Sequence, residues 1–271
     1  MTAKVKKLKL QRPMVFIDLE TTGTRWYSDR IVEFSMLKLS PDGVEECHSR
    51  RVNPEMLIPA EATATHGISN ADVEAEPTFR ELADGICDFL DGCDLSGFNI
   101  LGFDLPLLEI EFKRARVDFS RKGRQIVDSM AIFHMREARD PQNSRTLGAA
   151  YMKFCGKELT NAHSAESDVR ASVEVLEGQL ETYSDLPCDA GGLCLKCLDH
   201  RKHFVDSVEG KFRWLENGEA AFSFGRYTGH TIKEIALGDP GYFKWMLGQD
   251  FSPDVKKIIV NALGGKFPKR N

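Results

Sequence analysis

The hydrophobic and polar positions between residues 14 and 52 alternate in short blocks that are typical of strands. Residues 14–19 (MVFIDL) form an apolar run of the kind found in a buried strand, and polar residues with Gly23 end it. Residues 31–39 and 44–52 flank the sequence SPDG, in which Pro and Gly supply the backbone angles that a hairpin turn needs. The first part of the chain is therefore predicted to be an antiparallel meander.

Apolar residues then recur at helical spacing, with short strand-like runs between the helices. Thr78 stands where it can cap a helix over residues 79–90. Short strands are predicted at residues 94–98 and 125–128, and further helices at residues 104–116, 129–136, 146–154 and 164–183. Strands first, followed by alternating strands and helices, predict an α/β fold in which a mixed sheet is flanked by helices.

A break in this pattern divides the chain. Residues 13–183 carry the α/β pattern, whereas residues 184–210 contain Pro, paired Gly and clustered Cys and are expected to form a linker. Residues 211–271 are expected to form a small α-rich module, whose last helix is capped by Ser252 and ends at Gly264. Residues 1–12 are Lys-rich and lack apolar periodicity, so we expect a flexible basic arm there.

Composition narrows the class of protein. Hydrophobic residues make up 42% of the 271 residues and charged residues 28%, which is typical of a globular protein. The formal charge of −5, from 36 Lys and Arg against 41 Asp and Glu, excludes a uniformly basic nucleic-acid-wrapping protein but not a local basic surface. No apolar run reaches the roughly 18 residues that span a membrane, and no export signal is visible. Four of the seven cysteines are scattered through core-like sequence, which suits reduced thiols, so we expect a cytoplasmic protein with no membrane partner: Cys47, Cys87, Cys93 and Cys155.

Two acidic residues lie at the end of the first predicted strand. Asp18 and Glu20 alternate with apolar residues, so their side chains lie on one face, roughly 6–7 Å apart at about 3.3 Å per residue. Taken alone, such a pair is more often a solvated strand end than a metal site. The apolar context favours a site, because adjacent carboxylates leaving a hydrophobic strand repel each other unless a hard cation such as Mg²⁺ or Mn²⁺ compensates.

Three further residues extend this candidate site. Asp104 opens a predicted helix after a strand and a loop, where an acid also favours the helix dipole. His163 and Asp168 are five residues apart, which is about 500° of rotation along a helix, so they do not share a helical face. We expect Ser164 to cap the helix and His163 to lie on the preceding loop, with the two side chains converging on one pocket.

Three ordered motifs carry a resemblance to a known family: residues 15–23 (VFIDLETTG), 99–104 (NILGFD) and 163–168 (HSAESD). Over roughly residues 13–183 the chain resembles the DEDDh branch of the DnaQ-like 3′–5′ exonucleases, which includes the DNA polymerase III epsilon and exodeoxyribonuclease X types. The resemblance implies an RNase H-like fold with a mixed five-stranded sheet. It implies that His163 is the general base and that two Mg²⁺ or Mn²⁺ ions are held by the carboxylates of Asp18, Glu20, Asp104 and Asp168.

The same resemblance suggests five residues that contact the substrate. Thr21 and Thr22 follow the acids and would offer backbone and hydroxyl groups to the terminal nucleotide, although their simpler role is to end a strand. His66 belongs to a THGI segment that resembles a family loop near the 3′ terminus, and a surface loop histidine is an equally good interpretation. Asn99 and Phe103 match the second motif, but Phe103 also suits the core. Two other acids are assigned to the scaffold and not to the ligand set: Glu33 and Asp128.

Cys188, Cys194 and Cys197 lie close together in the predicted linker and are followed by His200, in the pattern C-x5-C-x2-C-x2-H. Thiolates are zinc ligands, but this spacing is not that of a standard zinc finger and no second ligand pair accompanies it. A linker with ordinary thiols and a short helix is therefore preferred to a Zn²⁺ site.

Residues 211–267 look like the C-terminal module of exodeoxyribonuclease X-like proteins, most clearly in residues 222–235 and 239–247. Aromatic residues there interleave with Arg226, Lys233 and Lys244, as on a surface that stacks single-stranded bases. A module of about 55 residues must use most of its aromatic residues in its own core, and this interpretation is the stronger of the two.

The expected function is a metal-dependent exonuclease that releases nucleoside 5′-monophosphates from the free 3′ end of DNA, with single strands favoured. Polymerase or repair proteins are candidate protein partners. Two alternatives stay open. One is an exoribonuclease of the same fold, because no residue clearly reads the 2′-hydroxyl. The other is a partner-docking subunit that acts mainly by binding.

Overall fold

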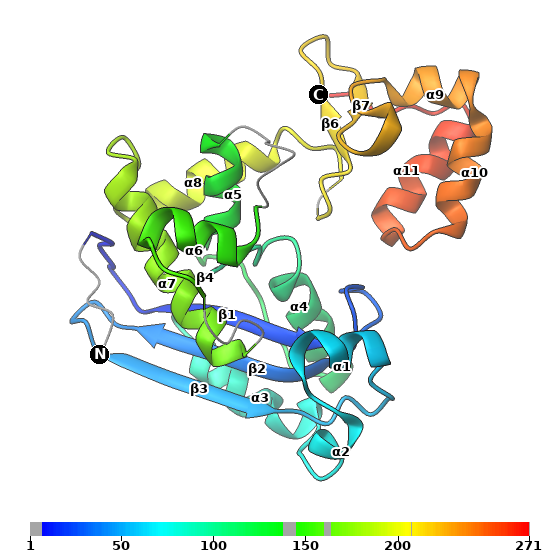
Figure 1. Cartoon of the computed structure of the whole chain (residues 1–271). Coiled ribbons are helices and arrows are strands. Elements are labelled where there is room, and N and C mark those ends of the chain that lie inside the picture. The colour runs from blue at the N-terminus through cyan, green and yellow to red at the C-terminus, as the bar shows by residue number, and fades with distance from the viewer. Residues whose placement is uncertain (1–6, 138–144, 160–163, 207, 271) are drawn as a thin grey trace. The chain divides into compact units, whose positions relative to one another are not determined.

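Five strands form one mixed sheet in the first part of the chain (Figure 1). They are β1 (Met14–Thr21), β2 (Ile31–Leu39), β3 (Glu45–Arg51), β4 (Asp94–Gly97) and β5 (Ile126–Asp128), in the order β3-β2-β1-β4-β5. β1, β2 and β3 pair antiparallel, whereas β4 pairs parallel with both β1 and β5. The predicted meander and the mixed five-stranded sheet are confirmed.

The computed structural model describes residues 7–137, 145–159, 164–206 and 208–270. The chain divides into two units, residues 1–197 and residues 198–271, and each is described by itself. In the described ranges, none of the helices is both long and apolar enough to span a bilayer.

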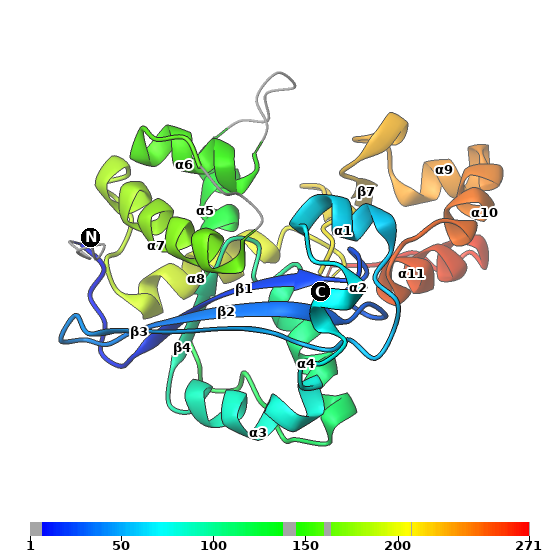
Figure 2. The ribbon, with the colours of Figure 1, turned by 60° about the horizontal axis from the view of Figure 1, so that its bottom comes forward.

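Helices cover both faces of the sheet in the first unit. Figure 2 shows α3 (Phe79–Leu90) and α4 (Asp104–Ala115) on one face, and α5 (Ser129–Arg136), α6 (Leu147–Cys155) and α7 (Ala165–Thr182) on the other. β1 is apolar along most of its length because it is buried on both sides. α6 and α7 pack closely at Gly178, where a Cβ atom would lie 2.7 Å from the carbonyl oxygen of Phe154.

Two short helices fill the stretch between β3 and α3, where the sequence analysis predicts no element. They are α1 (Ala60–His66) and α2 (Asn70–Val73). The second is held by a capping box, in which the Ser69 N–H donates to the Asp72 carboxylate at 2.8 Å. Helices of four and seven residues are too short to show a hydrophobic period, which is why the sequence pattern does not reveal them.

Residues 7–12 differ from the flexible arm that the sequence predicts. Leu8 is buried in the main core, and its N–H donates to the Glu177 carboxylate at 3.1 Å. The Lys9 N–H donates to the Cys188 carbonyl at 2.7 Å, and Arg12 forms an ion pair with Asp94. An apolar anchor and main-chain partners therefore fix these six residues to the first unit.

Residues 184–210, expected to be a linker, contain helix α8 (Ala190–Arg201). Leu193, Cys194 and Cys197 are buried on it. The helix starts where the Asp189 carboxylate accepts the Gly192 N–H at 2.8 Å. At Gly192 a Cβ atom would lie 2.5 Å from the Cβ atom of Pro187, so the glycine here permits close packing and does not break the helix.

The second unit has its own core around a small hairpin and three helices. Its elements are β6 (Phe212–Trp214), β7 (Ala220–Phe222), a 3₁₀ turn η1 (Gly225–Tyr227), α9 (Ile232–Gly238), α10 (Pro240–Gly248) and α11 (Pro253–Leu263). Phe212, Phe222 and Phe243 are fully buried in this core. Ser252 caps α11 as predicted, by accepting the Val255 N–H at 3.4 Å. The hairpin is an element that the α-rich expectation omits.

Candidate active site

Three of the four predicted metal ligands lie together at the sheet. Asp18 and Glu20 project from the same face of β1, and Asp168 lies in the first turn of α7, which packs on that face. One carboxylate oxygen from each residue lies within 4.8 Å of those of the other two. Among the described residues, this is the one group of three or more His, Cys, Asp or Glu side chains with that geometry.

Asp104, the fourth predicted ligand, is a buried neighbour of this group but does not belong to the close triad. It is the first residue of α4, and its charge raises the pKa of Asp18. The loop before it is held by Asp128, whose carboxylate accepts the N–H groups of Asn99 at 3.0 Å and Leu101 at 3.1 Å. The same carboxylate caps α5. The structure thus gives Asp128 the scaffold role that the sequence assigns to it.

Burial and neighbouring negative charges raise the pKa values of three carboxyl groups of the site: Asp18, Glu20 and Asp104. Burial, followed by the charges of Asp104, Asp168 and Glu20, holds the pKa of Asp18 well above its ordinary value. Burial, and then the charges of Asp168 and Glu33, raises the pKa of Glu20 to about 7. Burial also raises the pKa of Asp104 to about 8.

These residues fit a divalent cation. The donor atoms are hard carboxylate oxygens, which Mg²⁺ and Mn²⁺ prefer as ligands. The pKa values of Asp18 and Glu20 are raised because both carboxyl groups are buried and because ionised carboxylates beside them would repel their negative charge. A cation among them removes this repulsion, so the donor set can hold a divalent metal.

The predicted general base, His163, lies outside the described residues. Ser164, which follows it, occupies the N-cap position of α7, as expected. Its side chain makes no capping hydrogen bond to the helix, so only the position of the predicted cap is confirmed.

Three of the predicted substrate-contact residues meet at the end of β1. The Thr21 hydroxyl donates to the Gly23 carbonyl at 2.6 Å, and the Thr22 hydroxyl accepts the Arg30 N–H at 3.0 Å. His66 reaches from α1 to the same place. Its Nδ1 accepts the Ile68 N–H at 3.1 Å, so Nε2 carries the proton that it donates to the Thr21 carbonyl at 3.2 Å.

The other two predicted contacts, Asn99 and Phe103, lie in the loop before α4. Asn99 has a φ angle of 70°, a left-handed conformation that is uncommon for a side-chain-bearing residue. Its carbonyl accepts the N–H groups of Gly102 at 2.9 Å and Phe103 at 3.0 Å, which closes the loop. Phe103 is partly buried against the main core, in line with its alternative interpretation.

A buried ion network, which the sequence analysis misses, fixes the loop after the acids. Glu111 on α4 is 1% exposed and accepts from Arg30 at 2.7 Å and from Arg114 at 3.0 Å. Arg114 also donates to the carbonyls of three successive loop residues, Tyr27, Ser28 and Asp29. Glu111 stands three and four residues after two buried leucines of α4, so helical spacing gives a signal for its burial.

The three clustered cysteines do not form a metal-ligand group in the described chain. The Cys194 sulfur accepts the Ile126 N–H at 3.3 Å, and the Cys197 sulfur accepts the Asp128 N–H at 3.4 Å. These two thiols therefore join α8 to the backbone of β5.

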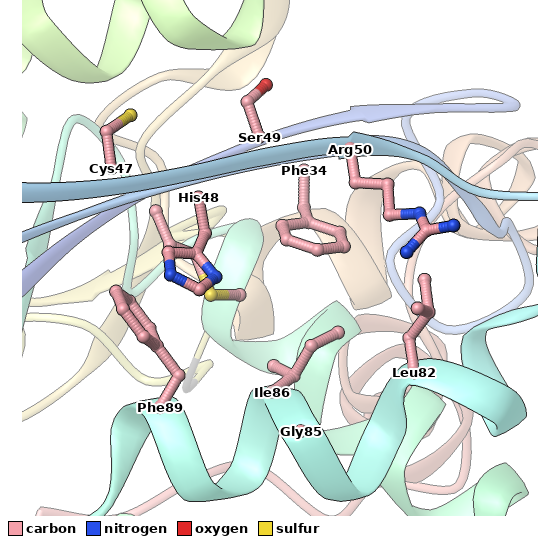
Figure 3. A pocket seen from close by; sticks show the side chains of 10 residues that line it. Phe34, Cys47, His48, Ser49, Arg50, Leu82, Gly85, Ile86 and Phe89 are labelled. Atoms are coloured by element: carbon pink, nitrogen blue, oxygen red, sulfur yellow. The ribbon is translucent and has the colours of Figure 1, made fainter.

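A hollow of about 450 Å³ lies on the opposite face of the sheet from the acids (Figure 3). Phe34 faces it from β2, and His48 and Arg50 point into it from β3, whereas Cys47 and Ser49 point away. Asp18 pairs with Ser35 across the sheet, so its side chain is on the face away from Phe34. None of the described residues that line this hollow is acidic, so they offer no carboxylate to a cation.

Comparisons with known proteins agree with this geometry. The sequence model of a family described as Exonuclease matches residues 15–176, and one described as Exodeoxyribonuclease X-like C-terminal matches residues 222–251. The 3′-5′ exonuclease DinG of Staphylococcus saprophyticus is 25% identical over 174 residues, which are 64% of this chain. The DinG protein of Staphylococcus aureus strain RF122 shows the same identity and coverage. The matched region spans only 19% of the length of either relative.

Solved structures show the same fold. An exonuclease I structure superposes with a TM-score of 0.58 at 21% identity, covering 71% of this chain and 44% of that one. Escherichia coli exonuclease I in complex with a dT13 oligonucleotide gives a TM-score of 0.54 at 22% identity, covering 62% of this chain and 40% of that one. The fold is thus the RNase H-like fold of exonuclease I. Because the family match extends over more than half of the chain and includes the acidic triad, this chain belongs to the exonuclease family.

Proposed function

We propose that this chain is a metal-dependent 3′–5′ exonuclease that hydrolyses DNA from a free 3′ end and releases nucleoside 5′-monophosphates. The observation that carries the proposal is the triad of Asp18, Glu20 and Asp168, whose carboxylate oxygens lie within 4.8 Å of one another. Membership of the exonuclease family and similarity to 3′-5′ exonuclease relatives support it.

In this proposal the four acids hold two Mg²⁺ or Mn²⁺ ions. Asp18, Glu20 and Asp168 supply the close set of oxygens, and Asp104 contributes from the start of α4. Bound ions of this kind activate water, neutralise the phosphate and stabilise the leaving 3′ oxygen. Four ionised carboxylates balance the four positive charges of two such ions. The net charge of −5 is therefore compatible with a polyanionic substrate.

His163 is proposed to accept the proton of the attacking water. The support is its place in the motif HSAESD, five residues before Asp168. A histidine with an ordinary pKa near 6.5 takes up a proton near neutral pH.

The terminal nucleotide is proposed to lie against the end of β1 and the loop before α4. Thr21 and Thr22 are the first residues after the acids, and His66 is tied to the Thr21 carbonyl. Their hydroxyl and imidazole groups already have intramolecular partners, so we assign to these residues mainly a shaping of the backbone that meets the nucleotide. Asn99 and Phe103 complete the proposed substrate contacts.

DNA is the proposed polymer because the second unit matches the C-terminal module of exodeoxyribonuclease X-like proteins. The neighbouring Escherichia coli exonuclease I is solved with dT13 and dA16 oligonucleotides, which are DNA single strands. Polymerase or repair proteins as further partners rest on the sequence resemblance alone. A cytoplasmic location is proposed as well, supported by seven free cysteines.

The experiment is a time course on matched single-stranded DNA and RNA, each labelled at the 5′ end, with Mg²⁺, Mn²⁺ or EDTA. We expect a ladder that shortens from the 3′ end of DNA, needs the metal, and is lost in His163→Ala. A ladder with RNA alone would identify an exoribonuclease. No ladder with either polymer would contradict catalysis and support the partner-docking alternative.

A further inference from the structure

Among the described residues of the second unit, one large aromatic side chain is exposed to solvent. Phe212, Phe222 and Phe243 are fully buried there, and Tyr242 is 9% exposed. Five further aromatic residues are partly buried against this core, so most of them are used there, as a small module requires: Trp214, Phe224, Tyr227, Phe251 and Phe267. Trp245, by contrast, is 51% exposed.

The indole of Trp245 is accessible because of its neighbours on α10. Gly241, Lys244, Trp245 and Gly248 are the exposed residues of one helical face, at the spacing i, i+3, i+4, i+7. We call these four residues the Trp245 face. Two of its members have no side chain, and a Cβ atom at Gly248 would meet nothing within 4 Å. No bulky group on the helix therefore shields the ring.

The ring is also supported from below. Trp245 stacks on Tyr242 with a centroid distance of 5.2 Å and an interplanar angle of 25°. The guanidinium carbon of Arg226 lies 4.9 Å from the Tyr242 ring centroid and 4.7 Å from that of Tyr227. Arg226 and Tyr227 in turn both donate to the Asp239 carboxylate at 2.7 Å. An aromatic ring held in this way loses little conformational entropy when a flat ligand stacks on it.

The charge of the unit favours an anionic ligand. Residues 198–271 contain twelve Lys and Arg against nine Asp and Glu, whereas residues 1–197 contain 24 against 32. Lys244 stands beside Trp245 on the exposed face, and no carboxylate of the described chain forms an ion pair with it. The Trp245 face thus combines an open π surface with a cation.

We propose that the Trp245 face binds single-stranded DNA, with a base stacked on the indole and a phosphate near Lys244. This inference rests on the proposed function, because it adds a DNA contact outside the acidic site. Single-stranded nucleic acids are bound by such pairs of an aromatic ring and a neighbouring cation, and stacking tolerates any base sequence. An enzyme that removes nucleotides one after another from the end of a DNA strand needs this tolerance of base sequence.

The test measures binding of the full chain to fluorescein-labelled oligo(dT) by anisotropy in EDTA, where no hydrolysis occurs. We expect Trp245→Ala to weaken binding about 10-fold, since the base loses the aromatic ring on which it stacks. Trp245→Phe should lose less affinity for oligo(dT) than Trp245→Ala does. Leu237→Ala is the matched control, because Leu237 is 73% exposed in the same unit, and it should bind like the wild type. Lys244→Ala should lower the slope of log affinity against log salt by about 0.7.

An oligonucleotide with abasic positions separates stacking from a general effect. The wild type and Trp245→Ala should bind it equally, because the phosphates remain and the bases are absent. Thermal melting by circular dichroism checks that both Trp245 variants fold. Affinity of Trp245→Ala within twofold of the wild type on oligo(dT), or an equal loss on abasic DNA, would overturn the inference. Absence of hydrolysis by the wild type in Mg²⁺ would instead contradict the proposed function.

Discussion

At the scale of single residues, Glu20 shows how the site is built. The charges of Asp168 from α7 and Glu33 from the neighbouring strand act on Glu20, and Glu20 and Glu33 are paired residues of β1 and β2. Burial and these two charges raise the pKa of Glu20 to about 7. The metal-free site therefore stores electrostatic repulsion that a bound cation relieves.

This repulsion predicts how stability depends on pH. In an unfolded chain Glu20 titrates near 4.5, but its pKa in the folded protein is about 7, and that of Asp104 is about 8. A carboxyl group whose pKa is raised by folding stabilises the folded form at any pH below its pKa in the unfolded chain. This stabilisation is lost as the pH rises through its pKa in the folded protein. In EDTA the melting temperature should therefore fall between about pH 4.5 and 8.

Differential scanning fluorimetry measures this fall. Mn²⁺ should raise the melting temperature more at pH 8 than at pH 5, because ionised carboxylates bind the cation. Glu20→Gln, which removes one of the charges, should make the fall in EDTA smaller. A melting temperature that rises steadily across this range in EDTA would contradict the electrostatic account.

The spacing of residues along the chain predicted which side chains lie together only where those residues are near in sequence. Strand alternation places Asp18 and Glu20 on one face, and the structure brings Asp168 to them. The ion pair between Arg30 and Glu111 joins residues 81 positions apart. Helical spacing indicates that Glu111 is buried, but no local pattern names its partner, because that partner depends on how α4 packs beside the loop.

At the scale of elements, the loop between β1 and β2 depends on α4. Glu111→Gln should destabilise the protein by about 3 kcal/mol, since it leaves two guanidinium groups without their buried carboxylate. Glu109→Gln is the matched control on the same helix. Glu109 pairs with the half-exposed Arg121, and losing such a pair costs about 1 kcal/mol or less. Urea unfolding of both variants measures the difference, and equal losses would show that the buried network adds no stability.

Among the elements, the long periodic helices were predictable, whereas the way in which the connections pack was not. α3, α4 and α7 agree with their apolar spacing to within a few residues. Helix α8 begins at Ala190, just after Pro187, whereas the sequence analysis expects only a short helix within a linker there. Its burial depends on contacts with β5, about 70 residues earlier, which a local pattern does not contain.

At the scale of the whole molecule, the overall charge hides two different parts. The net charge of −5 combines an acidic first unit with a second unit of net positive charge. Composition alone therefore excludes a uniformly basic surface but does not reveal a local one.

The order of elements predicts a mixed sheet, whereas the strand order β3-β2-β1-β4-β5 comes from the three-dimensional structure.

The central claim is that the carboxylate triad holds the metal ions that hydrolysis requires. The most direct test is the initial rate of single-stranded DNA hydrolysis as a function of Mg²⁺ concentration for the wild type, Asp168→Asn and Glu166→Gln. Asp168 belongs to the triad, whereas Glu166 lies on the same turn of α7 and pairs with the half-exposed Arg170.

We predict a saturable, EDTA-sensitive rate for the wild type and a similar rate for Glu166→Gln. Asp168→Asn should be slower by at least about 100-fold, equivalent to about 2.7 kcal/mol of activation free energy. An Asp168→Asn rate equal to that of the wild type at every Mg²⁺ concentration would contradict the account.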